Sequence, residues 1–225
     1  MPKPPVPHSS SEDISQFLAK VRGRAEHQGR LIFALDATAS REATWGRACS
    51  LHAEMFDVAA AFGGLAIQLA YYRGFREFYC SSWSNSPGSL LKEMSAVRCA
   101  GGRSQIGRIL KHAVKEQRER RVGALIFIGD AFEEDIDACC DTAGQLALLN
   151  LPVFVFQEGN DAAAERAMRQ IAKLSKGVYC RLDDNSAELL KELLRAIAAY
   201  VAGGLPEAKR LSSRHKQTQQ LLNQL

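Results

Sequence analysis

The sequence lacks the features that mark membrane, secreted or metal-cluster proteins. No apolar run is long enough to span a bilayer, and the Pro-rich start has no apolar segment typical of a secretory signal. The six cysteines show no CxxC spacing, so neither a zinc site nor a redox motif is indicated. The net charge of +4 is too small to indicate a nucleic-acid-binding face. We therefore expect a cytoplasmic protein with reduced thiols, no membrane span and no nucleic-acid partner.

What the sequence does contain is an alternation of apolar runs and helical segments. A chain of 225 residues with 46% hydrophobic residues can bury the core of one α/β domain. Strands are expected at 30–35, 65–72, 75–80, 124–128, 153–156 and 177–181, and helices near 42–62, 90–95, 105–120, 134–149, 162–174 and 186–202. Continuous apolar strands separated by helices predict a doubly wound, mostly parallel central sheet with helices on both faces. A hairpin turn at Arg73-Gly74 would add one antiparallel edge strand.

The ends of the chain differ in composition from this central part. Residues 1–11 are Pro-rich and polar and are expected to be disordered, and 12–28 are expected to form a leading helix. The α/β domain is expected to cover 30–203, and 204–225 form a polar C-terminal tail.

The most informative motif is Asp36-Ala37-Thr38-Ala39-Ser40, which directly follows an apolar strand. Open α/β sheets bind their ligands at the carboxyl ends of strands. One carboxylate and two hydroxyls are hard oxygen ligands of the kind that Mg²⁺ prefers. The alternative is that Asp, Thr and Ser here only form a turn and cap a helix.

Two further loops carry oxygen ligands to the same predicted edge of the sheet. Ser104 follows Gly101-Gly102-Arg103 just before a helix, and Asp130 lies in the turn directly after the strand 124–128. With the first motif they make a set of two acids and three hydroxyls, which suits Mg²⁺, or Mn²⁺ in its place, and leaves coordination positions open.

These three loops resemble the metal-ion-dependent adhesion site (MIDAS) of von Willebrand factor type A (VWA) domains. Asp36, Thr38 and Ser40 match its D-x-[ST]-x-S loop. Asp130 matches its last Asp, although the turn here is Gly-Asp-Ala. Ser104 stands where the family usually has threonine, and Arg103 is an extra residue after the glycine pair. The resemblance covers roughly residues 30–202.

The resemblance implies a Rossmann-like fold and a Mg²⁺-dependent protein-binding function. The three hydroxyls would face the ion directly or nearly so, and the two acids would act largely through bridging water. A carboxylate from a partner protein would fill the open position. Bacterial intracellular members of this kind often act in assemblies, with an AAA+ ATPase or another operon-encoded component as partner. We expect a rim formed by Arg73, Arg103 and Phe132, with Trp83 as a further candidate.

Two other functions remain open from the sequence. The departures at Arg103 and Ser104 are compatible with a scaffold protein whose metal site is degenerate. A metal-dependent phosphoryl-transfer hydrolase of the haloacid-dehalogenase kind would need a second acid two residues after Asp36, where this chain has Thr38. We therefore expect no enzymatic activity. The acidic run 133–137 predicts either a second ion site or, preferably, favourable acids in the first turn of a helix.

Overall fold

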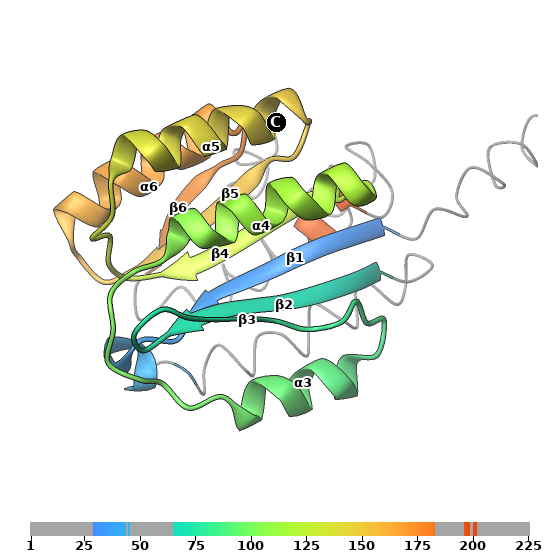
Figure 1. The fold of residues 1–225 in the computed structure, drawn as a ribbon, viewed down its shortest axis with the longest axis horizontal. Helices are drawn as coiled ribbons and strands as arrows, with labels where there is room; N and C mark the ends of the chain where they lie inside the picture. Colours follow the sequence, from blue (N-terminus) through green and yellow to red (C-terminus); the bar gives the residue numbers. More distant parts are fainter. Residues whose placement is uncertain (1–28, 44, 46–64, 183–195, 199, 202–225) are drawn as a thin grey trace, which may run out of the picture.

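Figure 1 shows the computed structural model, a layered α/β domain with one twisted sheet at its centre. The structure describes residues 29–43, 45, 65–182, 196–198 and 200–201. The leading helix and the two chain ends expected above lie outside these residues, as do most of the helices expected at 42–62 and 186–202. No helix within the described ranges combines the length and apolar character needed to cross a bilayer.

The described strands and helices alternate along the chain, as the apolar pattern predicts. The strands are β1 (Gly29–Asp36), β2 (Leu65–Arg73), β3 (Glu77–Cys80), β4 (Ala124–Gly129), β5 (Val153–Glu158) and β6 (Tyr179–Leu182). The helices are the 3₁₀ turn η1 (Ala39–Arg41), α3 (Pro87–Ala96), α4 (Ile106–Glu119), α5 (Ile136–Leu148) and α6 (Ala162–Leu174). The predicted positions agree to within a few residues, with the largest difference at the start of α3.

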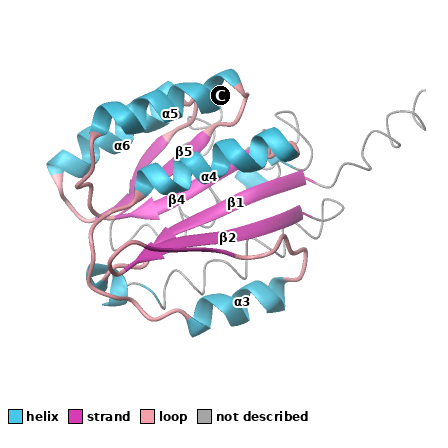
Figure 2. Cartoon of the chain, in the orientation of Figure 1, coloured by secondary structure: helices cyan, strands magenta, loops and turns pink. Residues whose placement is uncertain are grey.

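The described strands form one sheet in the order β3-β2-β1-β4-β5-β6. All neighbouring pairs are parallel except β2 and β3, which form the predicted antiparallel hairpin at one edge. The chain builds outward from β1 in one direction and from β4 in the other, so the strand order reverses between these two strands. Figure 2 shows that β1 and β4 point their arrowheads to the same edge of the sheet. Such a reversal is where open α/β sheets bind ligands.

Residues of β1 alternate between two apolar layers, one on each face of the sheet. Leu31, Phe33 and Leu35 contribute to the layer that contains α3 residues and the buried Trp45. Ile32 and Ala34 contribute to the layer formed with α4, α5 and α6. Burial on both faces explains why β1 reads as a continuous apolar run. It also holds the last residue of the strand, Asp36, at a fixed position.

Candidate metal site

Asp36 is fully buried at the carboxyl end of β1. Its Oδ1 accepts a hydrogen bond from the Thr38 backbone N–H at 2.7 Å, and its Oδ2 accepts one from the Tyr72 hydroxyl at 2.8 Å. Burial raises the pKa of this carboxyl above its usual value, the two hydrogen bonds oppose the rise, and the charge of Asp130 adds to it. A buried carboxylate beside a second carboxylate favours a cation in the same place.

The hydroxyls of Thr38 and Ser40 lie beside each other, with their Oγ atoms 3.1 Å apart. Thr38 precedes η1 in the N-cap position, but its side chain makes no capping hydrogen bond. The turn is formed instead by the Asp36 carboxylate. The alternative that these residues only form a turn and cap a helix therefore explains Asp36, but it does not explain the hydroxyls of Thr38 and Ser40. Ser40 is exposed, whereas Thr38 is buried.

The loop between α3 and α4 runs past the ends of β1 and β2, as the green segment of Figure 1 shows. Backbone hydrogen bonds attach the loop to the residues that follow both strands. The Ala100 N–H donates to the carbonyl of Ala37, after β1, at 3.1 Å, and the Gly74 N–H, after β2, donates to the carbonyl of Ala100 at 3.3 Å. A Cβ atom on Gly102 would lie 2.1 Å from the Gly74 carbonyl oxygen, so only glycine permits this approach. The loop therefore brings Ser104 to the same edge of the sheet as Asp36.

The turn after β4 brings the third loop to this edge. A Cβ atom on Gly129 would lie 3.4 Å from the Asp36 Cβ, so the ends of β1 and β4 are in contact. The Oδ1 atom of Asp130 is buried and has no hydrogen-bond partner among the residues that the structure describes. Buried carboxylate oxygens normally have a partner, and a bound cation would supply one. Asp130 is thus the residue whose surroundings best fit a metal ion.

Ser104 is joined to the Asp130 loop by a reciprocal pair of hydrogen bonds. Its Oγ accepts from the Glu133 N–H at 2.7 Å, and its own N–H donates to Glu133 Oε2 at 3.0 Å. A hydroxyl has two lone pairs and one proton, so the Ser104 oxygen keeps a lone pair for an ion. The two loops are held together at this point.

The acidic run after Asp130 serves two different helices. Asp135 is the N-cap of α5 and accepts from the Asp137 and Ala138 N–H groups. Glu134 reaches across to α4, where its side chain accepts from the Ile106 and Gly107 N–H groups. The expectation that all these acids belong to the first turn of one helix is therefore wrong for Glu134, and also for Glu133, which precedes the Asp135 N-cap and accepts from the Ser104 N–H. Its carboxylate satisfies the orphan donors of the neighbouring helix, which sequence spacing does not show.

The predicted rim residues have different surroundings. Arg103 is exposed, and Arg73 is partly exposed and pairs with Glu77 at 2.8 Å. Phe132 is half-buried and packs against the apolar layer of α4, α5 and α6. Trp83 is not at this edge, because its ring contacts Arg30 at the start of β1, with the guanidinium 3.7 Å from the ring centroid. A tryptophan after the short strand β3 lies at the opposite end of the sheet.

Sequence reasoning missed two residues that support the site. Tyr72 is fully buried at the end of β2, and burial together with the Asp36 charge raises the pKa of its hydroxyl well above the usual value, so the hydroxyl keeps its proton and donates a hydrogen bond to Asp36. Arg41, at the end of η1, is buried and pairs with Glu158 at the end of β5. Neither stands out in the sequence, because Tyr72 lies between Tyr71 and Arg73, and Arg41 lies between Ser40 and Glu42.

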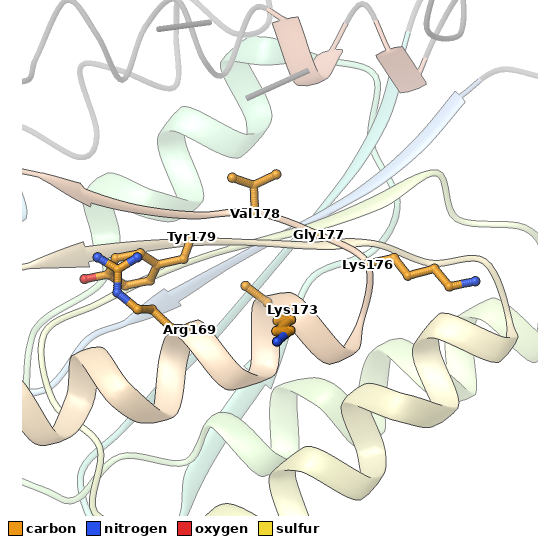
Figure 3. A pocket seen from close by; sticks show the side chains of 7 residues that line it. Arg169, Lys173, Lys176, Gly177, Val178 and Tyr179 are labelled. Carbon is orange, nitrogen blue, oxygen red and sulfur yellow. The ribbon is translucent and has the colours of Figure 1, made fainter. Parts of the chain in front are cut away.

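Within the described ranges, no three His, Cys, Asp or Glu side chains gather closely enough to hold an ion. An ion held by the described residues would therefore need ligands besides these side chains, and hydroxyls are one kind that the three loops offer. Figure 3 shows a different feature, an open groove of about 650 Å³ between α6 and β6. The charged ends of Arg169, Lys173 and Lys176 are spread along it and point in different directions, so they do not form an anion site. Arg169 pairs with Glu165 at 2.8 Å.

No protein-family model and no curated protein matches the sequence. Solved structures do match its fold. A von Willebrand factor type A protein from Catenulispora acidiphila superposes with a TM-score of 0.63 at 16% identity, over 78% of this chain and 43% of that one. The chain has the VWA fold.

Two further structures show the same VWA fold. The VWA domain of SpRpn10 matches with a TM-score of 0.59 at 11% identity, over 73% of this chain and 94% of that domain. Proximal thread matrix protein 1 from the mussel byssus, in a structure with a zinc-occupied MIDAS motif, matches with a TM-score of 0.61 at 14% identity, over 76% and 46% of the two chains. The present chain thus spans under half of the Catenulispora and mussel chains. At these identities the likeness establishes the fold alone.

Proposed function

We propose that this chain is a Mg²⁺-dependent protein-binding module that recruits an acidic side chain of a partner. Asp36, Thr38, Ser40, Ser104 and Asp130 would hold the ion. The observation that carries the proposal is the buried Asp130 Oδ1, which finds no partner in the described part of the chain and lies where the three loops are joined. Hydroxyls are neutral ligands, so the ion would keep charge with which to attract a carboxylate. The partner is a protein, for which an AAA+ ATPase or another operon-encoded component is the suggested class.

The same residues argue for binding rather than catalysis. Thr38 occupies the position of the proton-transferring acid of haloacid-dehalogenase-like enzymes, and its hydroxyl cannot act as a general acid or base at neutral pH. The Asp36 carboxylate accepts two hydrogen bonds, which hold it in place as a positioned ligand.

A scaffold with a degenerate metal site is the second candidate, and one observation favours it. The Ser104 hydroxyl already accepts from Glu133, and the Thr38 and Ser40 hydroxyls contact each other. These oxygens therefore have partners without an ion. Thermal melting in EDTA, Mg²⁺ and Mn²⁺ separates the two candidates, because an ion that binds only the folded state raises the melting temperature.

Calorimetric titration of Mg²⁺ into the chain tests the proposal directly. Wild-type protein is expected to bind the ion, and Asp36→Ala and Ser40→Ala are expected to lose most of that binding. Ser40 is exposed, so its variant should fold even if the loss of the Asp36 hydrogen bonds is disruptive. Asp141→Ala, an exposed position on α5, is the control. Pull-downs with and without EDTA then test the partner. Absence of Mg²⁺ binding by the wild type would refute the proposal.

A further inference from the structure

An exposed aromatic side chain lies at the turn between β2 and β3. Phe75 is 86% exposed, as much as any large hydrophobic residue in the part of the chain that the structure describes. The next residue, Arg76, has a φ of 60°, which holds the turn in a left-handed conformation, and its guanidinium lies 5.4 Å from the centroid of the Phe75 ring. A single exposed phenylalanine is not unusual, so its surroundings decide what it means.

The surroundings of Phe75 are strongly basic. The turn 73–77 and the segment 98–108 lie against each other: Arg73 Nη1 donates to the Arg98 carbonyl and Arg108 Nη1 donates to the Arg76 carbonyl, each at 2.7 Å. Together the two segments contain five arginines and one acid, Glu77. The arginines are Arg73, Arg76, Arg98, Arg103 and Arg108. We refer to Phe75 with these five residues as the arginine surface.

Part of the arginine surface is held in place before any partner binds. The guanidinium of Arg108 lies 5.2 Å from the Phe78 ring centroid and donates to Gln105 Oε1 at 2.6 Å. Arg73 donates to Glu77 at 2.8 Å. A hollow of about 380 Å³ opens beside them, lined by Arg73, Arg76, Phe78 and Arg108 among others. Side chains fixed in this way lose little entropy when a partner binds.

The arginine surface directly adjoins the candidate metal site. The Gly102 backbone touches Gly74 in the turn, and Ser104 is two residues further along the same loop. On the other side, the Ala37 N–H donates to the Tyr72 carbonyl at 2.9 Å, so the residue next to Asp36 is attached to the strand that leads into the turn. A protein whose carboxylate reached an ion at the site would also cover this surface.

We propose that the arginine surface binds an acidic segment of the partner protein, with Phe75 packed against an apolar side chain of that segment. The inference rests on the proposed function and names the chemistry of its partner. Arginines and aromatic anchors are enriched where proteins bind tightly, and the two segments contain five arginines and one acid, an excess of positive charge that is complementary to carboxylates. Two further acids, Glu133 and Glu134, contact the end of segment 98–108 next to the candidate metal site, where they accept from backbone N–H groups. Single-stranded nucleic acid is less suitable, because its binding sites stack successive bases on several aromatic rings. Phe75 is the most exposed ring at this surface, whereas Phe78 lies under the Arg108 guanidinium and Tyr79 packs on Tyr71, so the rings here do not form an open row for successive bases.

A random dodecapeptide library displayed on phage tests the inference with the full chain as bait. Peptides selected in Mg²⁺ are expected to combine Asp or Glu with a large apolar residue. Synthetic copies should bind about tenfold or more weakly to Phe75→Ser and to Arg76→Asn, since both positions contribute to the contact. Asparagine tolerates the left-handed conformation at position 76. Leu148→Ser, 84% exposed on α5, and Arg118→Asn, exposed on α4, are the matched controls and should bind like the wild type.

The two proposals fail in different ways in this experiment. Acidic peptides that bind equally in EDTA and to Asp130→Asn, yet are lost with Phe75→Ser, would support the arginine surface and refute the metal-dependent function. Peptides that need Mg²⁺ but bind Phe75→Ser and Arg76→Asn normally would support the metal-dependent function and refute the arginine surface. Enrichment of non-acidic peptides, or no enrichment, would overturn the inference. The inference would also be overturned if oligothymidine bound more tightly than the peptides and its binding depended on Phe75.

Discussion

The replacement Asp130→Asn distinguishes the stability that the candidate metal site costs without an ion from the stability that it gains when Mg²⁺ binds. The change is nearly isosteric and keeps the Oδ1 atom that is buried without a partner, but it removes the charge beside the buried Asp36. Without metal, that charge is unfavourable because it lies near the carboxylate of the buried Asp36. We expect the variant to raise the free energy of unfolding of the metal-free protein by about 1 kcal/mol. For a domain of this size that is about 2–4 °C in melting temperature.

Magnesium should reverse this order of stability. At a concentration 100 times its Kd, an ion that binds only the folded wild type adds about 2.7 kcal/mol, or about 5–11 °C. Asp130→Asn removes a negative charge from the ion's surroundings, so its gain should fall below about 1 kcal/mol. The variant is thus expected to be more stable than the wild type in EDTA and less stable in excess Mg²⁺.

The pH dependence follows from Asp36. Burial raises its pKa in the folded protein, so the folded state holds the proton more tightly than the unfolded chain. The contribution of Asp36 to the stability of the metal-free wild type should be fully present below the pKa of the unfolded carboxyl and be lost as the pH rises through the raised value. The Mg²⁺-induced gain should be largest above that range, where the carboxylate is charged.

Differential scanning calorimetry in EDTA and in Mg²⁺, across this pH range, measures the stability change without metal, the gain from Mg²⁺ and the pH dependence. Asp141→Asn makes the same chemical change at an exposed position of α5 and should behave as the wild type does. The reasoning is refuted if Asp130→Asn gains as much from Mg²⁺ as the wild type, or if it destabilises the metal-free protein.

Three further substitutions test other parts of the structure. Gly102→Ala should weaken Mg²⁺ binding and lower stability, because its Cβ would meet a carbonyl oxygen at 2.1 Å. Gly101→Ala, with open space around it, should do neither. Equal calorimetric results for the two variants would contradict this prediction. Tyr72→Phe removes a hydrogen bond to Asp36, the first proposed metal ligand, and should lower Mg²⁺ affinity about 10–100-fold, measured by titration. Unchanged affinity would mean that the hydroxyl does not position Asp36. Glu116→Ala leaves the buried Arg30 without its ion-pair partner and should lower the free energy of unfolding, measured in urea, by about 3–5 kcal/mol. A loss under about 1 kcal/mol would show that the pair is not effectively buried.

The order of elements and the motif were accessible from the sequence because they depend on local patterns. The apolar run of β1 and the alternating helices define a doubly wound sheet, and a parallel sheet aligns the carboxyl ends of its strands. Asp36 and Asp130 each follow such a strand, so their placement at one edge required no knowledge of side-chain contacts. The same logic predicted the antiparallel β3 from the turn at Arg73-Gly74.

Tertiary structure alone decided which side chains meet across those loops. The pairing of Ser104 with Glu133, the reach of Glu134 to the start of α4 and the hydrogen bond from Tyr72 to Asp36 join residues 27 or more positions apart. No sequence period encodes such distances, which depend on strand register and on how closely loops approach at Gly102. For the same reason Trp83, which the sequence allowed at the rim, lies at the other end of the sheet. The sequence by itself determined which chemical groups the loops carry and at which edge of the sheet; the packing of strands and loops determined how those groups are held.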